Sequence, residues 1–215
     1  ETARTALVNA RSKWVHSARG ILRSFGFRVP GGSTSLFHTR CAKVDMPDDL
    51  RDVVQPLLNQ IERVSDEIQA LEERLENIAA TNPVVKHLQS VPGVGTIVSM
   101  YFVAAIDDPD RFQRSRDVAA FFGLRPILRG SGEICHHGRI SKEGDPEMRR
   151  LLIQAAHGMI NSRKSCALQQ WALKLADKKG KRKALVALAR KLAVLLHHLW
   201  VTGEVFQSFP KQQNA

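Results

Sequence analysis

The hydrophobic positions of this chain recur mainly at steps of three and four, the spacing that places side chains on one face of an α-helix. A first helix is predicted over residues 3–27 from Leu7, Ala10, Trp14, Ala18, Ile21, Leu22 and Phe25. The stretch "FGFRVPGGSTS" then ends the pattern with Gly and Pro residues. Residues 30–46 are therefore predicted to form a linker or a loosely ordered loop.

The middle of the chain has the clearest periodicity. Apolar residues alternate steps of four and three over about four heptads, at Leu50, Val54, Leu57, Ile61, Val64, Ile68, Leu71, Leu75 and Ile78. Pro56 is expected to kink or delay this helix. The narrow seam and charged flanks favour a coiled coil over residues 47–81, which pairs with another copy or folds back on the first helix. A single long helix on a globular core is the alternative.

A helix-turn-helix unit is predicted next, with helices at 83–90 and 96–107 joined by "VPGVG". Free amides near Gly93, Gly95 and Thr96 would lie at a helix N-terminus, where unpaired N–H groups and the helix dipole favour a phosphate. The pattern resembles the helix-hairpin-helix motif, which grips the DNA backbone without reading bases. Many helix pairs turn on such a sequence without binding anything, so both interpretations stay open.

Four more helices are predicted at 115–122, 146–161, 164–177 and 181–201, with a possible short hairpin between the first two. Asp145 is a good N-cap because Pro146 and Glu147 follow it. The sequence thus predicts an all-α fold, with a long coiled-coil arm and a compact helical domain. The expected divisions are 1–29 (basic helix), 30–46 (linker), 47–81 (coiled coil), 82–207 (compact domain) and 208–215 (tail).

The net charge of +11 is unevenly spread along the 215 residues. Residues 1–44 hold eight Lys or Arg against one acid, residues 45–80 three against ten, and residues 81–215 twenty-one against ten. Basic segments on both sides of an acidic one indicate a polyanion partner for the ends and a protein contact for the middle. A basic protein without a nucleic-acid partner is the plainer alternative.

Other features narrow the class of protein. No run of 18 apolar residues occurs, so a membrane span is not predicted. The first residues lack Met and an apolar signal core, which suggests the middle of a longer protein. Cys41, Cys135 and Cys166 have no metal-ligand spacing, so reduced thiols in a cytosolic protein are expected.

The segment "GSGEICHHGRISKEGDPEMRRLL" at residues 130–152 concentrates candidate chemistry. Phosphodiester cleavage needs an oxygen nucleophile, cations that hold the phosphate and a backbone free to bring them together. Ser131, between two glycines, and Ser141 are the candidate nucleophiles, and chemistry alone does not rank them. Nearby His136 and His137 could act as base or acid, although adjacent loop histidines are usually polar surface. The candidate phosphate ligands are Arg129, Arg139, Lys142, Arg149 and Arg150.

Three stretches carry a family resemblance: "LQSVPGVGTIVSMYFVAAIDDPDRFQRSRDVAAFFGLRP", "SGEICHHGRISKEGDPEMRRLLIQAA" and "KGKRKALVALARKLAVLLHHLW". They resemble the C-terminal transposase domain of the "one-ten" insertion-sequence recombinases, also called DEDD transposases, which are related to pilin-gene invertases. The resemblance covers roughly residues 1–207. Its specific part is the order G-L-x-P, S-G, R-I-S-K-x-G-D and R-x-L, which occurs here complete.

The resemblance implies site-specific DNA recombination through a phosphoserine intermediate. It favours Ser131 as nucleophile, with Ser141 the second choice because the matching family position admits Thr. Arg139, Lys142, Gly144 and Arg149 match the surrounding motif, where phosphate or nucleic-acid contact is the natural role of the cations.

The family's metal-binding carboxylates lie in a RuvC-like nuclease domain, which this chain lacks. Mg²⁺ is therefore expected in that domain, and no metal or cofactor is expected here. Asp107, Asp108 and Asp110 are interpreted as a helix-ending loop. Without the nuclease domain, the chain is expected to lack strand cleavage by itself.

The implied partners are DNA, a structured guide ("bridge") RNA encoded by the element, and further copies of the chain through the coiled coil. The expected location is the bacterial cytoplasm, in association with the nucleoid and not with a membrane. The leading alternative is a non-catalytic module that binds DNA or RNA and dimerises. A third interpretation makes the heptad segment an assembly scaffold.

Overall fold

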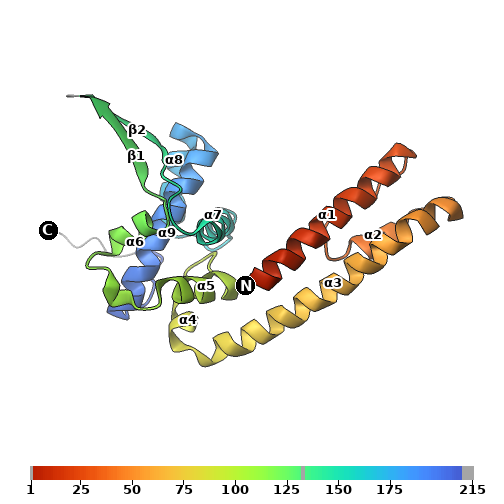
Figure 1. The fold of residues 1–215 in the computed structure, drawn as a ribbon. Coiled ribbons are helices and arrows are strands. Elements are labelled where there is room, and N and C mark those ends of the chain that lie inside the picture. The colour runs from red at the N-terminus through yellow and green to blue at the C-terminus, as the bar shows by residue number, and fades with distance from the viewer. Residues whose placement is uncertain (1, 132–133, 210–215) are drawn as a thin grey trace. The chain divides into compact units, whose positions relative to one another are not determined.

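The computed structural model of the protein describes residues 2–131 and 134–209, without the side chains of residues 128–137. The chain forms two compact units, Glu1–Asn77 and Ile78–Ala215, here called the N-terminal and C-terminal units (Figure 1). Helices make up almost all regular structure among the described residues, and one two-stranded sheet is the exception. The predicted all-α fold class is therefore confirmed.

The N-terminal unit consists of α1 (Thr2–Ser24), α2 (Phe37–Ala42) and most of α3 (Asp48–Thr81). Its core joins all three helices and comprises Val15, Ala18, Leu22, Phe37, Cys41, Met46, Leu50, Val54, Leu58 and Ile61. Phe37 and Cys41 are fully buried, so the segment predicted as a linker contributes to this core. Burial of Cys41 also raises the pKa of its thiol.

Helix α3 buries the first part of the predicted seam against α1 and α2. Val64 and Ile68 continue the buried stripe beyond the core, whereas Ile78 is 57% exposed. Pro56 lies inside α3, which begins at Asp48, so the predicted delay is wrong. A proline there removes one backbone hydrogen bond, and burial of the neighbouring apolar side chains offsets that loss. Pairing as a coiled coil stays a prediction.

Polar contacts tie the start of α1 to the second half of α3. The Arg4 guanidinium forms an ion pair with Glu72. Two turns further along α1, Arg11 Nη1 donates to Ser65 Oγ over 3.3 Å. Burial lowers the pKa of Arg11, and the nearby Glu72 carboxylate opposes that shift. The two helices therefore lie side by side with their directions opposed (Figure 1).

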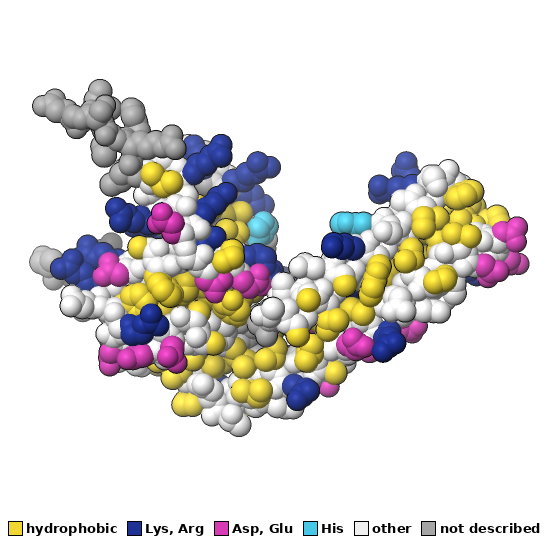
Figure 2. Space-filling model, viewed as in Figure 1, with side chains coloured by type: hydrophobic (Ala, Val, Ile, Leu, Met, Phe, Trp, Pro, Cys, Tyr) yellow, Lys and Arg dark blue, Asp and Glu magenta, His cyan; other side chains and the backbone are white. Residues whose placement is uncertain are grey.

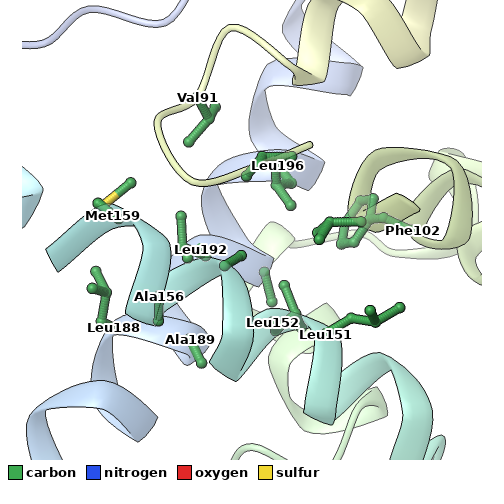
Figure 3. Packing of buried hydrophobic residues seen from close by; sticks show 14 of the residues in the cluster. Val91, Phe102, Leu151, Leu152, Ala156, Met159, Leu188, Ala189, Leu192 and Leu196 are labelled. Atoms are coloured by element: carbon green, nitrogen blue, oxygen red, sulfur yellow. The ribbon is translucent and has the colours of Figure 1, made fainter. Parts of the chain in front are cut away.

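The C-terminal unit is built around α9 (Lys181–Thr202), which packs against α6 (Ser115–Phe121), α7 (Pro146–Ile160) and α8 (Ala167–Lys179). Figure 3 shows Leu151, Leu152, Ala156 and Met159 of α7 facing Leu188, Ala189, Leu192 and Leu196 of α9. Val91, and Phe102 of α5 (Thr96–Ile106), belong to the same core. The buried side chains of α7 and α9 recur at steps of three and four, as on one face of a helix, while Leu195 of α9 is only partly buried.

Local sequence signals set several ends of these helices. The Asp145 carboxylate accepts hydrogen bonds from the amides of Glu147 (2.8 Å) and Met148 (3.2 Å), as its predicted N-cap role requires. Asn82 caps α4 (Pro83–Leu88) in the same way. Asp107 ends α5, and Asp108 caps the 3-10 turn η1 (Pro109–Arg111). The acidic cluster thus forms the helix-ending loop expected from the sequence.

Buried His197 of α9 fixes this loop to α6. Its Nε2 lies 2.9 Å from the Pro109 carbonyl oxygen, and its Nδ1 lies 3.0 Å from Ser115 Oγ. Because a carbonyl can only accept, Nε2 donates to Pro109, while Nδ1 and the Ser115 hydroxyl share the second hydrogen bond. His197 therefore holds η1 and α6 on α9.

Helix α9 is also the described helix that could cross a membrane by length and composition, but half of its most apolar stretch is buried inside the protein. Core helices meet the same criterion, and α9 has nine buried residues, seven of which belong to this core. Its apolar character is explained by its central position in the C-terminal unit.

Buried Gln169 caps the end of α7 from α8, which gives a stability prediction. Its Nε2 donates to the carbonyls of Met159 (3.0 Å), Ile160 (3.2 Å) and Ser162 (2.8 Å). Gln169→Leu removes all three bonds. The Met159 carbonyl keeps the Ser162 amide as a donor, but the carbonyls of Ile160 and Ser162 lose the Gln169 donor, so the free energy of unfolding should fall by about 1–3 kcal/mol in urea titration. Gln170→Leu is the matched control. The side chain of Gln170 is exposed, and its Nε2 donates to the Ser165 hydroxyl rather than to a backbone carbonyl. Equal effects of the two changes would contradict the capping role.

Candidate functional site at the base of the hairpin

The segment with the two candidate serines forms an antiparallel hairpin of β1 (Pro126–Ser131) and β2 (Ile134–Ile140). The strands extend away from the helices of the C-terminal unit (Figure 1). Ser131 is the last residue of β1 and pairs with Ile134. The side chains of Ser131 and Arg129 lie outside the described part of the structure, so their predicted roles stay predictions.

The base of the hairpin is locked to the end of α6 by two glycines. Gly123 has φ +67°, and a Cβ on it would lie 1.9 Å from the Glu143 carbonyl oxygen. Gly144 has φ +87°, and a Cβ on it would lie 2.0 Å from the Phe121 carbonyl oxygen. Each glycine therefore allows the other segment's backbone to approach, and no larger residue fits at either place.

Backbone hydrogen bonds reinforce this lock. The Ser141 amide donates to the Arg125 carbonyl over 2.8 Å, and the Lys142 amide donates to the Gly123 carbonyl over 3.1 Å. Lys142 itself has φ +60°, an unusual value for a residue with a side chain. The Ser141 hydroxyl accepts from the Glu143 amide over 3.4 Å. Ser141 is therefore engaged as a turn residue in this ordered base.

Arg149 lies at the centre of the base. Its Nη1 donates to the carbonyl oxygens of Phe122 (3.1 Å), Glu143 (3.2 Å) and Gly144 (3.1 Å). This nitrogen joins the end of α6 to the turn before α7. The contact with phosphate predicted for Arg149 is untested, whereas its bonds to the backbone give it a definite structural role.

The other candidate cations have different surroundings. Arg150 forms an ion pair with Glu147 and donates to Gln154 Oε1 over 3.2 Å. Arg139 and Lys142 are exposed and line the same groove, which is described below. The structure therefore brings Arg139 and Lys142 together at the hairpin base and places Arg150 in contacts along α7.

The turn "VPGVG" between α4 and α5 packs against α7. Gly93 has φ +84°, and a Cβ on it would lie 2.4 Å from the Ala155 carbonyl oxygen. Gly95 is the N-cap of α5 and has no side chain to bond the first amides, while Thr96 Oγ1 accepts from Gln89 Nε2 over 3.2 Å. Gly93 is thus required by packing, and phosphate binding at Gly93, Gly95 and Thr96 stays a prediction.

No group of three or more His, Cys, Asp or Glu side chains among the described residues could hold a metal ion. Asp108 Oδ1 is used by the Asp110 amide at 2.9 Å, which fits a capping role for this cluster. The acidic cluster is therefore explained by its role at the helix ends.

A groove of about 1560 Å³ on the C-terminal unit was missed by sequence reasoning. It lies between the hairpin base, α8, α9 and residues 206–208. A sequence signal for it exists on α9, where Arg182, Val186, Arg190, Val194 and His198 recur every four residues and all line the groove. This row mixes cations with aliphatic residues on one face of a helix.

Comparison with known proteins finds similarity to transposases. Residues 85–172 match the model of the transposase IS116/IS110/IS902 family. The chain is 28% identical over 211 residues to the transposase for insertion sequence element IS1111A of Coxiella burnetii, covering 95% of this chain and 58% of that protein. It is 29% identical over 209 residues to the transposase for insertion sequence element IS1328 of Yersinia enterocolitica, covering 94% and 62%.

A more distant match is the pilin gene-inverting protein of Moraxella bovis, which is 27% identical over 143 residues and covers 64% of this chain and 44% of that protein. The chain thus spans a little over half the length of the first relatives that it matches. The matched family model covers the hairpin, its base and α7.

Proposed function

The chain belongs to the IS116/IS110/IS902 family of transposases, and we propose that it supplies the nucleophile and part of the DNA-binding surface of a DNA recombinase. The observation that carries the proposal is the hairpin. Its backbone register puts Ser131 in the last pair of the ladder, with Gly130 before it. The base of the same hairpin is fixed by the Gly123–Gly144 lock.

The proposed step is a transesterification at phosphorus. The Ser131 hydroxyl oxygen attacks a DNA phosphodiester, a new P–O bond to serine forms, and the P–O bond to the leaving strand breaks. A general base takes the serine proton, and the leaving oxygen receives a proton. Attack by a strand hydroxyl on the phosphoserine then reverses these bonds and joins DNA.

The geometry supports separate roles for the two ends of the hairpin. Glycines beside Ser131 permit close approach of a bulky phosphate to the backbone. Lower down, exposed Arg139 and Lys142 offer cations to a neighbouring phosphate. The base of the hairpin is fixed to the C-terminal unit, and Ser131 lies at its far end. The Ser131 hydroxyl could therefore enter a groove of duplex DNA while the base stays packed.

The remaining partners follow from the family. We propose binding of duplex DNA and of a structured guide RNA by the basic surface, and self-association through α3. Carboxylates of a RuvC-like domain outside this chain would hold Mg²⁺ and supply Lewis-acid chemistry there. We therefore expect strand cleavage to require that domain.

A non-catalytic binding module is the second candidate. It is favoured by the engagement of Arg149 and Arg150 in protein contacts, which leaves fewer cations for a transition state. In this alternative the hairpin holds nucleic acid and Ser131 performs no chemistry.

Ser131→Ala in the full-length protein tests the proposal. Loss of the nucleophile should lower the recombination rate by about 10³-fold or more, while the affinity for element-end DNA in a gel-shift titration stays within about twofold. The matched control is Ser141→Ala, which removes a turn hydroxyl and should retain recombination. Retained recombination in Ser131→Ala would favour the binding module, and loss only in Ser141→Ala would reassign the nucleophile.

A further inference from the structure

The groove on the C-terminal unit has a largely aliphatic floor. Its walls come from β2, α8, α9 and residues 206–208, and its volume is about 1560 Å³. The floor includes Ile140, Leu168, Val186, Val194 and Leu195, all partly exposed rather than sealed in the core. Such a long apolar surface is stabilised when another apolar surface covers it.

The rim of the groove is strongly basic. Seven Lys or Arg residues line it, among them Arg139, Lys179, Lys183 and Arg190, and no Asp or Glu is among its described lining residues. His198, which also lines the groove, has its Nε2 atom 3.4 Å from a carboxylate oxygen of Glu204. Figure 2 shows Lys and Arg side chains gathered over the region of α8. An occupant must therefore combine an apolar face with negative charge.

A single nucleic-acid strand fits this surface less well than a protein helix does. Strand-binding grooves stack successive bases on open aromatic faces. Here the described aromatic lining residues are Phe206 and Trp171, and Lys191 Nζ lies over the Trp171 ring, 4.4 Å from its centroid. The floor is mainly aliphatic, which suits the apolar stripe of an amphipathic helix. Acidic residues beside such a stripe would meet the basic rim.

The chain itself carries a helix of this kind in residues 66–81 of α3. This stretch holds five acids and one arginine. Leu71, Leu75 and Ile78 lie on one stripe by their spacing of four and three, and none of them belongs to the buried core of either unit. The sixteen residues are about 24 Å long, close to the span of Arg182–His198 on α9.

We propose that the groove on the C-terminal unit of one copy receives residues 66–81 of α3 from a second copy. The stripe of Leu71, Leu75 and Ile78 would cover the aliphatic floor. The acids would face the cations of α8 and α9, which leaves those of the hairpin base for phosphate. This inference goes beyond the proposed chemistry at Ser131 and does not depend on it. It assigns self-association to a groove-and-helix contact rather than to pairing of two α3 helices.

A charge-swap experiment on the protein tests this contact. Lys183→Glu with Arg190→Glu reverses two charges at the centre of the contact on the rim, and Glu73→Lys with Glu76→Lys reverses two charges on the helix. Each pair alone should weaken the dimer by about tenfold or more in sedimentation velocity, because like charges then face each other. All four changes together should restore the association.

The controls separate this contact from a general effect of charge. Arg163→Glu with Lys174→Glu makes the same charge change on exposed residues outside the groove, and the dimer should keep its dissociation constant. Circular dichroism checks that each variant folds. Carbodiimide cross-linking of mixed heavy- and light-isotope copies should join Lys183 to an acid of residues 66–81 between different copies.

Three results would overturn the proposal. One is an unchanged dissociation constant in both charge-reversed pairs, which leaves the α3 seam as the interface. Another is cross-linking only within one copy. The third is a rim reversal that leaves self-association intact but abolishes binding of single-stranded oligonucleotides, which makes the groove a nucleic-acid site. None of these results bears on the Ser131→Ala test.

Discussion

Gly144→Ala is expected to lower the free energy of unfolding of the C-terminal unit by about 3–5 kcal/mol, or to prevent its folding. The added Cβ would lie 2.0 Å from the Phe121 carbonyl oxygen, and the backbone at φ +87° disfavours any side chain. Neither atom belongs to a flexible side chain, so the clash can be relieved only by opening the hairpin base. Since small domains are stable by about 5–15 kcal/mol, the loss is a large share. Urea titration followed by circular dichroism measures it.

Two companion variants make this result interpretable. Gly123→Ala should have a similar effect, because its Cβ would lie 1.9 Å from the Glu143 carbonyl oxygen on the opposite side of the lock. Gly180→Ala is the control, because Gly180 also has φ +87° but nothing within 4 Å of an added Cβ. Its cost should be the backbone strain of about 1–3 kcal/mol. Equal losses at Gly144 and Gly180 would show that the close approach is absent.

The helices were predictable where the sequence carries both a period and an end signal. For α7, Asp145 and Pro146 marked the start and the apolar spacing marked the buried face, and the structure has both. Helix α2 was missed because its six residues are too short to show a period, and burial of Phe37 depends on α1 and α3. The delay predicted at Pro56 is wrong because packing outweighs the loss of one backbone hydrogen bond, whereas the predicted kink stays a prediction.

The candidate site was predictable in its residue types and not in its contacts. Gly123 and Gly144 are 21 positions apart. No local sequence pattern shows that a side chain on either glycine would clash with the backbone next to the other. Arg149 was predicted to contact phosphate because the sequence shows its charge but not the direction of its side chain. Its bonds to three backbone carbonyls could not be predicted. The groove escaped notice because its lining comes from segments spread over 124–208. A charge pattern therefore indicates a polyanion or an acidic partner, and only the fold shows where one fits.

Arg149→Met is expected to destabilise the C-terminal unit by about 2–4 kcal/mol. Methionine keeps much of the apolar stem but removes the nitrogen that donates to the carbonyls of Phe122, Glu143 and Gly144. These carbonyls join two segments, so the change both leaves acceptors unpaired and loosens the base. Arg149→Lys should recover only part of the loss, because its ammonium ends one bond short of the position of Nη1, which makes all three hydrogen bonds. Thermal and urea unfolding of the two variants measure both effects.

Arg150→Met is the matched control, because it changes the adjacent cation on the exposed side of α7, where an ion pair with Glu147 contributes about 0–1 kcal/mol. A structural role for Arg149 predicts a large difference in stability between the two variants and similar salt dependence of DNA binding. A role in phosphate contact alone predicts the reverse, with equal stabilities and a salt slope of DNA binding reduced by about one for Arg149→Met.

The two effects can also occur together. If Arg149→Met both destabilises the protein and lowers the salt slope of DNA binding, the same guanidinium fixes the hairpin base and contacts the DNA backbone. In that case the lock at Gly123 and Gly144 would also position the Arg149 guanidinium for contact with DNA. The Gly144→Ala variant should then bind DNA more weakly even at temperatures where it is still folded.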